Sequence, residues 1–280
     1  MNQGPVSCLP MNSKMSKVKK ALDEAHEINA RELDLVDKNV ISFDEMSGIL
    51  NMLNVTRITL TIPPGIANLT NLEILNLANN QIEELPVSIS SMPKLRILNV
   101  SINRLSSLPR GFGAFPMLEV LDLSYNNLNE SMLPGNFFMM ETLRALYLGD
   151  NEFEFLPPGL GNLKNLQILG LRDNFLLEIP REIGELTRLR ELHIQNNRLT
   201  VIPPEVGLLD LQSNKSVLKM EENEWVPQIA EQYLLGINHV LEYIKTDAYR
   251  IMFNRLESGS RPGKIPPKAD KSKKASRARN

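Results

Sequence analysis

Cysteine is nearly absent from the sequence, and this limits the environments that suit the chain. Cys8 is the single cysteine among 280 residues. One cysteine cannot form an internal disulfide, so nothing in the chain predicts folding in an oxidising compartment. The N-terminal residues carry no apolar segment of signal-peptide length, and no run of about 18 apolar residues predicts a membrane-spanning helix. We therefore expect a cytoplasmic protein that is neither secreted nor an integral membrane protein.

Residues that carry catalytic chemistry are also few. The three histidines, His26, His193 and His239, are far apart in the sequence. The chain has no phosphate-binding glycine loop, no zinc-ligand spacing and no nucleophile elbow. Its acidic residues are scattered and form no metal-like cluster. We therefore expect no catalytic site, no metal and no cofactor, and we do not interpret the chain as an enzyme.

Net charge is small overall but uneven along the chain. Residues 261–280 hold eight Lys or Arg and one Asp, which is +7, so the net charge of -2 leaves -9 for the rest. A mildly acidic body argues against a nucleic-acid-binding fold. The basic tail is compatible with a nuclear-localisation signal or a membrane-surface patch, but a solvated, solubilising tail is the more common outcome of such composition.

What the chain does have is an internal repeat of the pattern L-x-x-L-x-L-x-x-N. Six copies occur, and each ends in an asparagine. The intervals between these asparagines are 23, 23, 25, 23 and 23 residues. Six matches at near-constant spacing are far beyond chance. The ladder asparagines are Asn80, Asn103, Asn126, Asn151, Asn174 and Asn197.

A Leu-Pro or Ile-Pro pair runs in phase with the repeat, six positions after each asparagine. The exception is Leu133-Pro134, which comes eight positions after Asn126. The longer repeat is therefore a regular repeat with two residues added, and we expect a loop beyond the asparagine turn to absorb them.

The pattern predicts an α/β fold, a leucine-rich-repeat solenoid with a parallel concave sheet and a helical or 3₁₀ convex side. Alternating leucines make a short strand with one apolar face, and stacked copies bury that face in a continuous core. The asparagine amide both donates and accepts, so it suits the backbone groups freed at the turn. Proline fixes φ on the convex side, where no ladder hydrogen bond is lost.

The ends of the repeat region are less regular. Remnant strands are predicted at 32–35 and 55–62, and a degenerate last strand at 218–223. Apolar residues then recur at helical spacing after Pro227, which predicts one or two amphipathic helices over the open end, with Trp225 anchoring the junction. We expect a flexible segment at 1–30 (1–14 as an extension), the solenoid at 31–223, the helical cap at 224–257 and a basic, disordered tail at 258–280.

The concave face is the candidate binding site, because solenoids typically bind partners there. Tyrosine and arginine dominate interface hot spots, and both occur in the variable positions of the middle and later repeats. Gly149 and Gly170 reflect either close approach of a partner backbone or chance variation. The candidate partner-binding residues are Asp122, Tyr125, Arg144, Tyr147, Asp150, Arg172, Asp173, Arg190 and His193.

The motifs LPRGFGAFPMLEVLDLSYNNLNESMLPGNFFMMETLRALYLGDN, REIGELTRLRELHIQNNRLTVIPPE and ENEWVPQIAEQYLLGINHVLEYI resemble the Ras suppressor protein family. The resemblance runs from about Met15 to the basic tail. Two features depart from it. Residues 1–14 extend beyond the family's start, and the repeat at 55–64 is shortened, with Arg57 in place of a ladder asparagine.

The resemblance implies a non-catalytic adaptor at cell–matrix adhesions. Such a protein binds the last LIM domain of the PINCH adaptor, joins the complex of integrin-linked kinase and parvin, and restrains Ras-driven signalling. On its own we expect the chain to be monomeric. One alternative is a direct regulator of a small GTPase or of a Ras effector. A third reading, a phosphatase-type regulatory subunit, shares the fold but has no specific residue in its favour.

Overall fold

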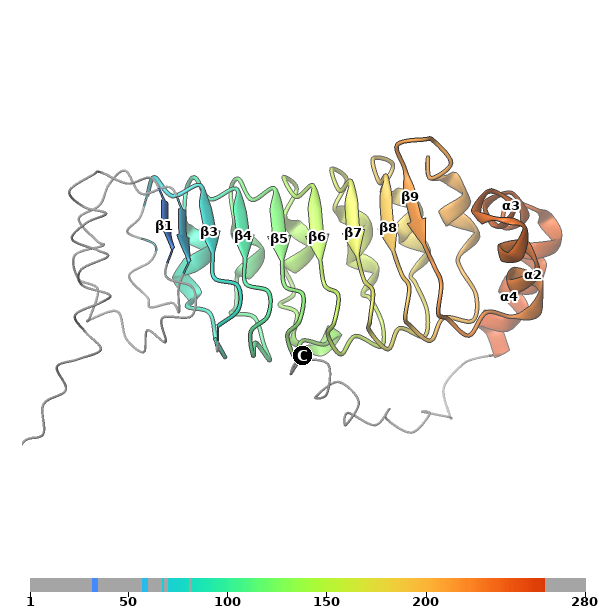
Figure 1. Ribbon diagram of the computed structural model, residues 1–280, viewed down its shortest axis with the longest axis horizontal. Coiled ribbons are helices and arrows are strands. Elements are labelled where there is room, and N and C mark those ends of the chain that lie inside the picture. The colour runs from blue at the N-terminus through green and yellow to red at the C-terminus, as the bar shows by residue number, and fades with distance from the viewer. Residues whose placement is uncertain (1–31, 35–56, 60–66, 68–69, 81, 260–280) are drawn as a thin grey trace, which may run out of the picture.

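A single parallel sheet organises the chain. The computed structural model describes residues 32–34, 57–59, 67, 70–80 and 82–259. Within these ranges nine strands follow one another in sequence order, each paired in parallel with the next (Figure 1). The strands are β1 Glu32–Asp34, β2 Arg57–Thr59, β3 Ile74–Asn76, β4 Ile97–Asn99, β5 Val120–Asp122, β6 Ala145–Tyr147, β7 Ile168–Gly170, β8 Glu191–His193 and β9 Val217–Lys219.

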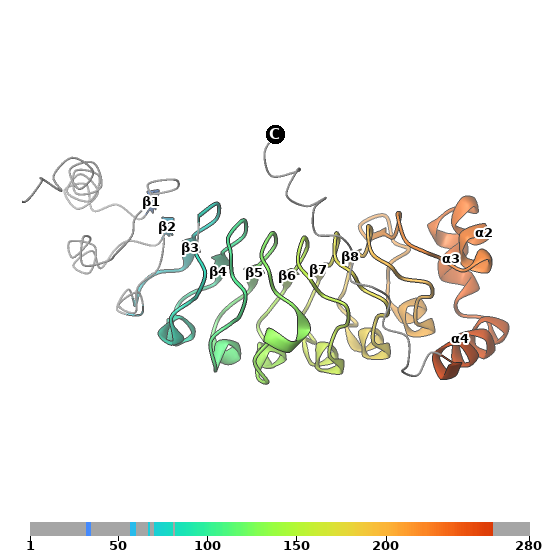
Figure 2. The ribbon, with the colours of Figure 1, turned by 90° about the horizontal axis from the view of Figure 1, so that it is seen from below.

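Short 3₁₀ helices form the opposite side of the solenoid. Seen from below, the strands line the inner side of a shallow arc and the 3₁₀ helices its outer side (Figure 2). This confirms the predicted leucine-rich-repeat architecture. The regular repeats contribute η3 Val87–Ser91, η4 Phe112–Ala114, η7 Pro158–Asn162, η8 Arg181–Glu185 and η9 Pro204–Leu208.

The predictions for the N-terminal and C-terminal segments are tested only in part. Strands β1 and β2 lie where the remnant strands are predicted. Three parts of the chain lie outside the described residues: the segment predicted to be flexible at 1–30, which holds Cys8 and His26, residues 55–56 and 60–64 of the shortened repeat, and residues 260–280 of the basic tail.

The core lies between the sheet and the 3₁₀ helices. Each strand's central leucine is fully buried from β3 to β8, as with Leu75, Leu121 and Leu169. The apolar residue two positions after this leucine is buried too, as with Leu123 and Leu171. Each such side chain contributes roughly 1.5–3 kcal/mol by leaving water. Because each leucine packs on those of its neighbours, no repeat is stable alone.

The ladder asparagines from Asn103 to Asn197 each close their turn with four hydrogen bonds. Asn151 is fully buried. Its Oδ1 accepts from the Leu128 backbone N–H at 3.0 Å, and its Nδ2 donates to the carbonyls of Leu123, Leu148 and Gly149 at 3.0–3.1 Å. Among the described residues, the bond to Oδ1 is the one that satisfies the buried Leu128 N–H, while each of the three carbonyls also accepts from a second donor: Asn126 Nδ2, Asn174 Nδ2 and the Tyr125 N–H, respectively.

The residue before each of the six ladder asparagines, and the residue before Asn223 in the last repeat, has a left-handed backbone. Seven non-glycine residues have φ between 53° and 56°. This conformation costs roughly 1–2 kcal/mol per residue, and Asn and Asp tolerate it best. We call this row the rim; it comprises Asn79, Ile102, Tyr125, Asp150, Asp173, Asn196 and Glu222.

The two-residue insertion after Asn126 forms ordered structure. It supports η5 Glu130–Met132, where the Asn129 side chain accepts from the Ser131 N–H, and it is followed by η6 Phe137–Met139. The ring of Phe137 stacks on Phe112 with centroids 6.2 Å apart. A Cβ at Gly113 would lie 1.8 Å from the Asn136 carbonyl oxygen, so only glycine allows this close approach.

Three helices cover the C-terminal end among the described residues, one more than the upper prediction of two. They are α2 Pro227–Leu235, α3 Ile237–Tyr243 and α4 Asp247–Gly259. Gly236, at φ 122°, ends α2 and lets the chain turn directly into α3. Helix α4 runs past the predicted start of the tail at residue 258.

Two side chains fix this cap by hydrogen bonds, one of them partly buried and the other fully buried. The indole N–H of Trp225 donates to the Met220 carbonyl at 2.9 Å, which places it at the predicted junction. The hydroxyl of Tyr249, fully buried, donates to the Ile202 carbonyl at 2.6 Å and accepts from the Ile202 N–H at 3.2 Å. Within the described residues, no helix has both the length and the apolar composition needed to cross a bilayer.

Candidate functional site

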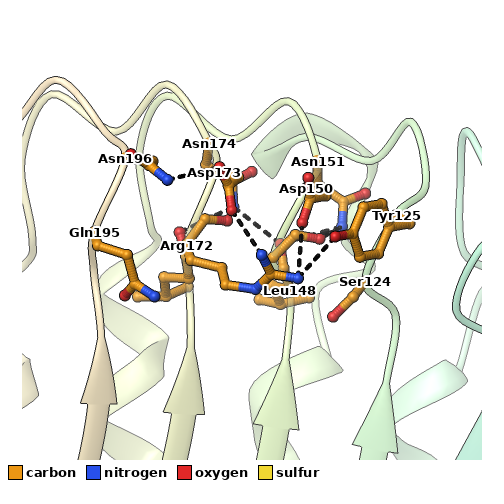
Figure 3. A network of polar contacts seen from close by, with 12 residues as sticks. Ser124, Tyr125, Leu148, Asp150, Asn151, Arg172, Asp173, Asn174, Gln195 and Asn196 are labelled. Atoms are coloured by element: carbon orange, nitrogen blue, oxygen red, sulfur yellow. Dashed lines mark hydrogen bonds and ion pairs between the residues drawn. The ribbon is translucent and has the colours of Figure 1, made fainter. Parts of the chain in front are cut away.

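The most connected polar cluster on the concave side is built around Arg172. Its guanidinium donates from Nη2 to the Tyr125 hydroxyl at 2.9 Å and from Nη1 to Asp173 Oδ2 at 2.9 Å. The same Nη2 lies 3.2 Å from Asp150 Oδ2. Figure 3 shows the side chain reaching across the Asp150 repeat toward Tyr125. One arginine therefore links three consecutive repeats.

This cluster is prearranged in both geometry and charge. The Arg172 Cζ atom lies 5.3 Å from the centre of the Tyr125 ring, a cation–π contact. Partial burial lowers the pKa of Arg172, but the hydrogen bond to Tyr125 and the charges of Asp150 and Asp173 outweigh it, so the net pKa is raised. The guanidinium therefore stays charged, and a partner would meet an ordered tyrosine ring and an ordered cation.

Gly149 makes room for the arginine stem. A Cβ at Gly149 would lie 3.0 Å from Arg172 Cγ and 3.3 Å from the Arg172 carbonyl oxygen. In the same way, a Cβ at Gly170 would lie 3.0 Å from Tyr147 Cδ1. Side chains of this chain thus lie over both glycines, an arrangement that neither sequence interpretation of these positions foresaw.

Tyr147 and His193 lie on the open face of the sheet, on either side of Gly170. The strand register aligns Tyr147 with Gly170 and Gly170 with His193. Burial raises the pKa of the Tyr147 hydroxyl, and the charges of Glu191 and Asp122 raise it further. Burial and the charge of Lys219 lower the pKa of His193. Both side chains are therefore neutral near pH 7.

Two polar atoms beside this face lack a hydrogen-bond partner among the described residues. They are Nε2 of His193 and Oε1 of Gln195, and both atoms are buried. The Glu191 carboxylate lies 3.6 Å from Nε2 of the imidazole. Unsatisfied polar atoms are few in folded proteins, and they are commonest where function constrains the side chains.

The other predicted site residues lie apart from the Arg172 cluster. Arg144 and Arg190 precede strands β6 and β8, at the opposite edge of the sheet. Arg144 lies 3.6 Å from Glu119, and Arg190 lies 3.7 Å from Asp210. Asp122 accepts from the Ser124 N–H at 2.9 Å, so it also holds the end of its own strand.

Sequence reasoning missed the rim as a structural unit. Asn196 belongs to the cluster, because its Nδ2 donates to Asp173 Oδ1 at 3.0 Å. Ile102 lies on the same rim and is 48% exposed. The sequence does indicate this unit, because four of the seven rim residues are Asn or Asp. That preference is typical of left-handed backbone.

Comparisons with known proteins agree with this fold. A family model described as a leucine-rich repeat region matches residues 105–234, and one described as a leucine rich repeat matches residues 50–105 and 70–128. A leucine-rich-repeat protein of Leptospira interrogans has a TM-score of 0.58 at 27% identity, covering 78% of this chain and 61% of that one. The Arabidopsis receptor kinase HAESA, solved with the peptide hormone IDA and the co-receptor SERK1, has a TM-score of 0.58 at 28% identity, covering 70% and 35%.

Curated relatives match over a shorter stretch. Ras suppressor protein 1 of Homo sapiens and of Mus musculus are each 53% identical over 70 residues, which is 25% of this chain and 24% of each relative. The match thus spans about a quarter of the relatives' length, less than the stretch from Met15 to the tail that the motifs suggest. The chain has the leucine-rich-repeat fold, with partial similarity to Ras suppressor protein 1.

Proposed function

We propose that this chain is a non-catalytic adaptor whose concave face binds a LIM-domain protein of the PINCH type. Through that partner it would join integrin-linked kinase and parvin in the cytoplasm at cell–matrix adhesions and restrain Ras-dependent signalling. The partial similarity to Ras suppressor protein 1 supports the choice of partner. The Arg172 cluster supports the choice of face.

The observation that carries the proposal is the order already present in that cluster. Arg172 is held by three side chains, at 2.9 Å from Tyr125, 2.9 Å from Asp173 and 3.2 Å from Asp150. Binding loses affinity when flexible side chains must be immobilised, so a prearranged surface binds more tightly than a mobile one. Tyrosine and arginine are also the residues that most often dominate binding energy.

A titration with a purified PINCH-type LIM domain tests this proposal. We expect Arg172→Glu to weaken binding at least tenfold, because it removes the Tyr125 bond and places a third carboxylate beside Asp150 and Asp173. We expect Tyr147→Ala to weaken binding less, through the loss of apolar contact area. Isothermal titration calorimetry gives both dissociation constants.

The matched control is Lys164→Glu on the convex side. Lys164 forms an exposed ion pair with Glu185, so the charge change equals that of Arg172→Glu but lies on the other surface. Binding should then equal that of the unmodified chain. If neither concave variant changed the affinity, the concave face would not be the binding site. Tight binding of a nucleotide-loaded Ras-like GTPase in place of the LIM domain would favour the direct regulator instead.

A further inference from the structure

Two rim residues do not suit the backbone they adopt. Ile102 and Tyr125 have φ of 54° and 55°, whereas four of the other five rim positions are Asn or Asp. A β-branched residue with positive φ is a genuine outlier, because its Cβ substituents crowd the backbone. The rim therefore carries avoidable strain at these two neighbouring positions.

Burial does not compensate for this strain. The side chain of Ile102 is 48% exposed and that of Tyr125 is 45% exposed. Asparagine at either place would suit the backbone better and expose less apolar surface. Strained residues that persist without a packing reason occur most often at binding and catalytic sites. An exposed apolar pair on a polar rim has the same implication.

The two residues form one continuous contact surface. They lie on adjacent rungs, since the Ile102 N–H donates to the Ser124 carbonyl at 2.9 Å and the Asn103 N–H to the Tyr125 carbonyl at 3.1 Å. Arg172 holds the Tyr125 ring by its hydroxyl, at 2.9 Å, and lies 5.3 Å from the ring centre. The ring is therefore already fixed before any partner binds, which reduces the entropy lost on binding.

The charge along the rim differs between the two sides of the apolar pair. On one side of the apolar pair lies neutral Asn79. On the other side, the rim residues and the residues immediately before them carry four negative charges, on Asp150, Asp173, Glu221 and Glu222, and one positive charge, on Arg172, so the net charge of these positions is -3. The carboxylates that share Arg172 are half-buried, while Glu221 and Glu222 are exposed. This side of the rim therefore favours cationic side chains.

We propose that Ile102 and Tyr125 anchor an apolar side chain of a partner segment that carries Lys or Arg residues beside it. The apolar side chain lies on the pair, and the cationic residues extend along the rim toward Glu222. This deepens the proposed adaptor function, on which it rests for the identity of the whole partner. The chemistry of the segment follows from the rim and from the charged residues beside it.

The decisive variants are Ile102→Asn and Ile102→Ala. Asparagine removes the anchor and relieves the backbone, so we expect the melting temperature to rise by about 2–4 °C. Alanine removes the anchor with less relief, so the gain should be smaller. Both should weaken binding of the PINCH-type LIM domain about tenfold in calorimetry. Val87→Asn is the control, since Val87 is 65% exposed on the convex side. This variant should leave binding unchanged and should not raise the melting temperature.

A peptide-display selection separates this inference from the adaptor proposal. With the unmodified chain as bait, we expect enrichment of peptides with one large apolar residue next to Lys or Arg, and loss of that enrichment with Ile102→Asn as bait. If the LIM domain fails to bind but this enrichment appears, the adaptor proposal is wrong and the rim inference stands. Enrichment that survives Ile102→Asn, acidic motifs, no enrichment, or a melting temperature lowered by Ile102→Asn would overturn the rim inference.

Discussion

The middle of the solenoid and its C-terminal cap bury their polar backbone in different ways. In the middle, every repeat uses the same asparagine with the same four bonds, as at Asn151 and Asn174. In the cap, individual side chains that do not repeat form the hydrogen bonds to the backbone. Tyr249 pairs both polar groups of Ile202, and Trp225 pairs the Met220 carbonyl.

The difference follows from what each region can repeat. A ladder residue sits between two copies of itself, so one solution serves every rung and each rung depends on its neighbours. The last repeat has another repeat on one side only, and helices α2, α3 and α4 lie on its other side (Figure 1). Non-repeating contacts must therefore join two different kinds of structure. We expect the ladder to fail through its shared bonds and the cap through its individual ones.

The largest expected effect comes from breaking one rung in the middle. Asn151→Ala leaves the buried Leu128 N–H unpaired and removes one of two donors from each of three carbonyls. An unpaired buried N–H costs about 1–3 kcal/mol. The weakened carbonyls and the lost packing of a fully buried side chain add to this cost, so the free energy of unfolding should fall by about 4 kcal/mol. Urea unfolding followed by circular dichroism measures this loss.

Asn223→Ala sharpens the comparison, because it breaks the same bonds at the edge of the cap. Asn223 accepts from the Leu199 N–H and donates to the carbonyls of Ile194, Met220 and Glu221. It is half-buried where Asn151 is fully buried, so water can replace part of what is lost. We expect a loss of about 1–2 kcal/mol. Equal losses in the two variants would show that burial does not set the cost.

The regular part of this fold is readable from the sequence because it is local and periodic. The spacing of the ladder asparagines gives strands β3 to β8, and the prolines give the 3₁₀ helices that follow them. The cap is only partly readable. Helical periodicity continues through Gly236, so the break between α2 and α3 is visible only as a permissive residue whose φ of 122° the sequence does not specify.

The candidate site is less predictable still. The repeat positions predict Tyr125, Asp150 and Arg172 on the concave side, but they do not predict that Arg172 contacts Tyr125, which precedes it by 47 residues. That reach depends on the rotamer of a long side chain and on the space above Gly149. The strain at Ile102 is equally hidden, because it depends on φ and not on residue type alone.

An effect smaller than that of Asn151→Ala is expected from the cap's central hydroxyl. Tyr249→Phe keeps the ring but leaves the buried N–H and carbonyl of Ile202 unpaired. We expect a loss of about 2 kcal/mol in the free energy of unfolding. Hydrogen exchange should quicken at Ile202 and in the cap while the ladder near Asn151 stays protected. Uniform loss of protection along the chain would contradict the separation of the two regions.

Alkaline pH tests the same contact without a mutation. Burial raises the pKa of Tyr249 above its ordinary value of 10.0. The folded chain therefore holds this proton at pH values where the unfolded chain has released it. The contribution of Tyr249 to stability is therefore constant well below pH 10. It decreases as the pH rises above 10, because the unfolded chain releases this proton while the folded chain still holds it. Tyr249→Phe should show a flatter decline above pH 10 than the unmodified chain.

The smallest expected effect is at the surface contact between the convex side and helix α4. Arg181, on η8, lies 2.9 Å from Glu257 and 3.1 Å from Glu205, with its Cζ atom 4.8 Å from the Phe253 ring centre. Its side chain is 37% exposed, so water screens these charges. We expect Arg181→Ala to cost about 1 kcal/mol, less at high salt.

Arg188→Ala is the matched control for that contact. Arg188 is an exposed convex-side arginine that donates to Asn165 at 2.7 Å, a residue of the preceding repeat. It joins two like repeats, whereas Arg181 joins a repeat to the cap. Removing it should change stability by less than about 0.5 kcal/mol and leave hydrogen exchange in α4 unchanged. If both variants loosened α4 equally, the cap would be held by the ladder's general rigidity, and the contrast between shared and individual contacts would fail at this interface.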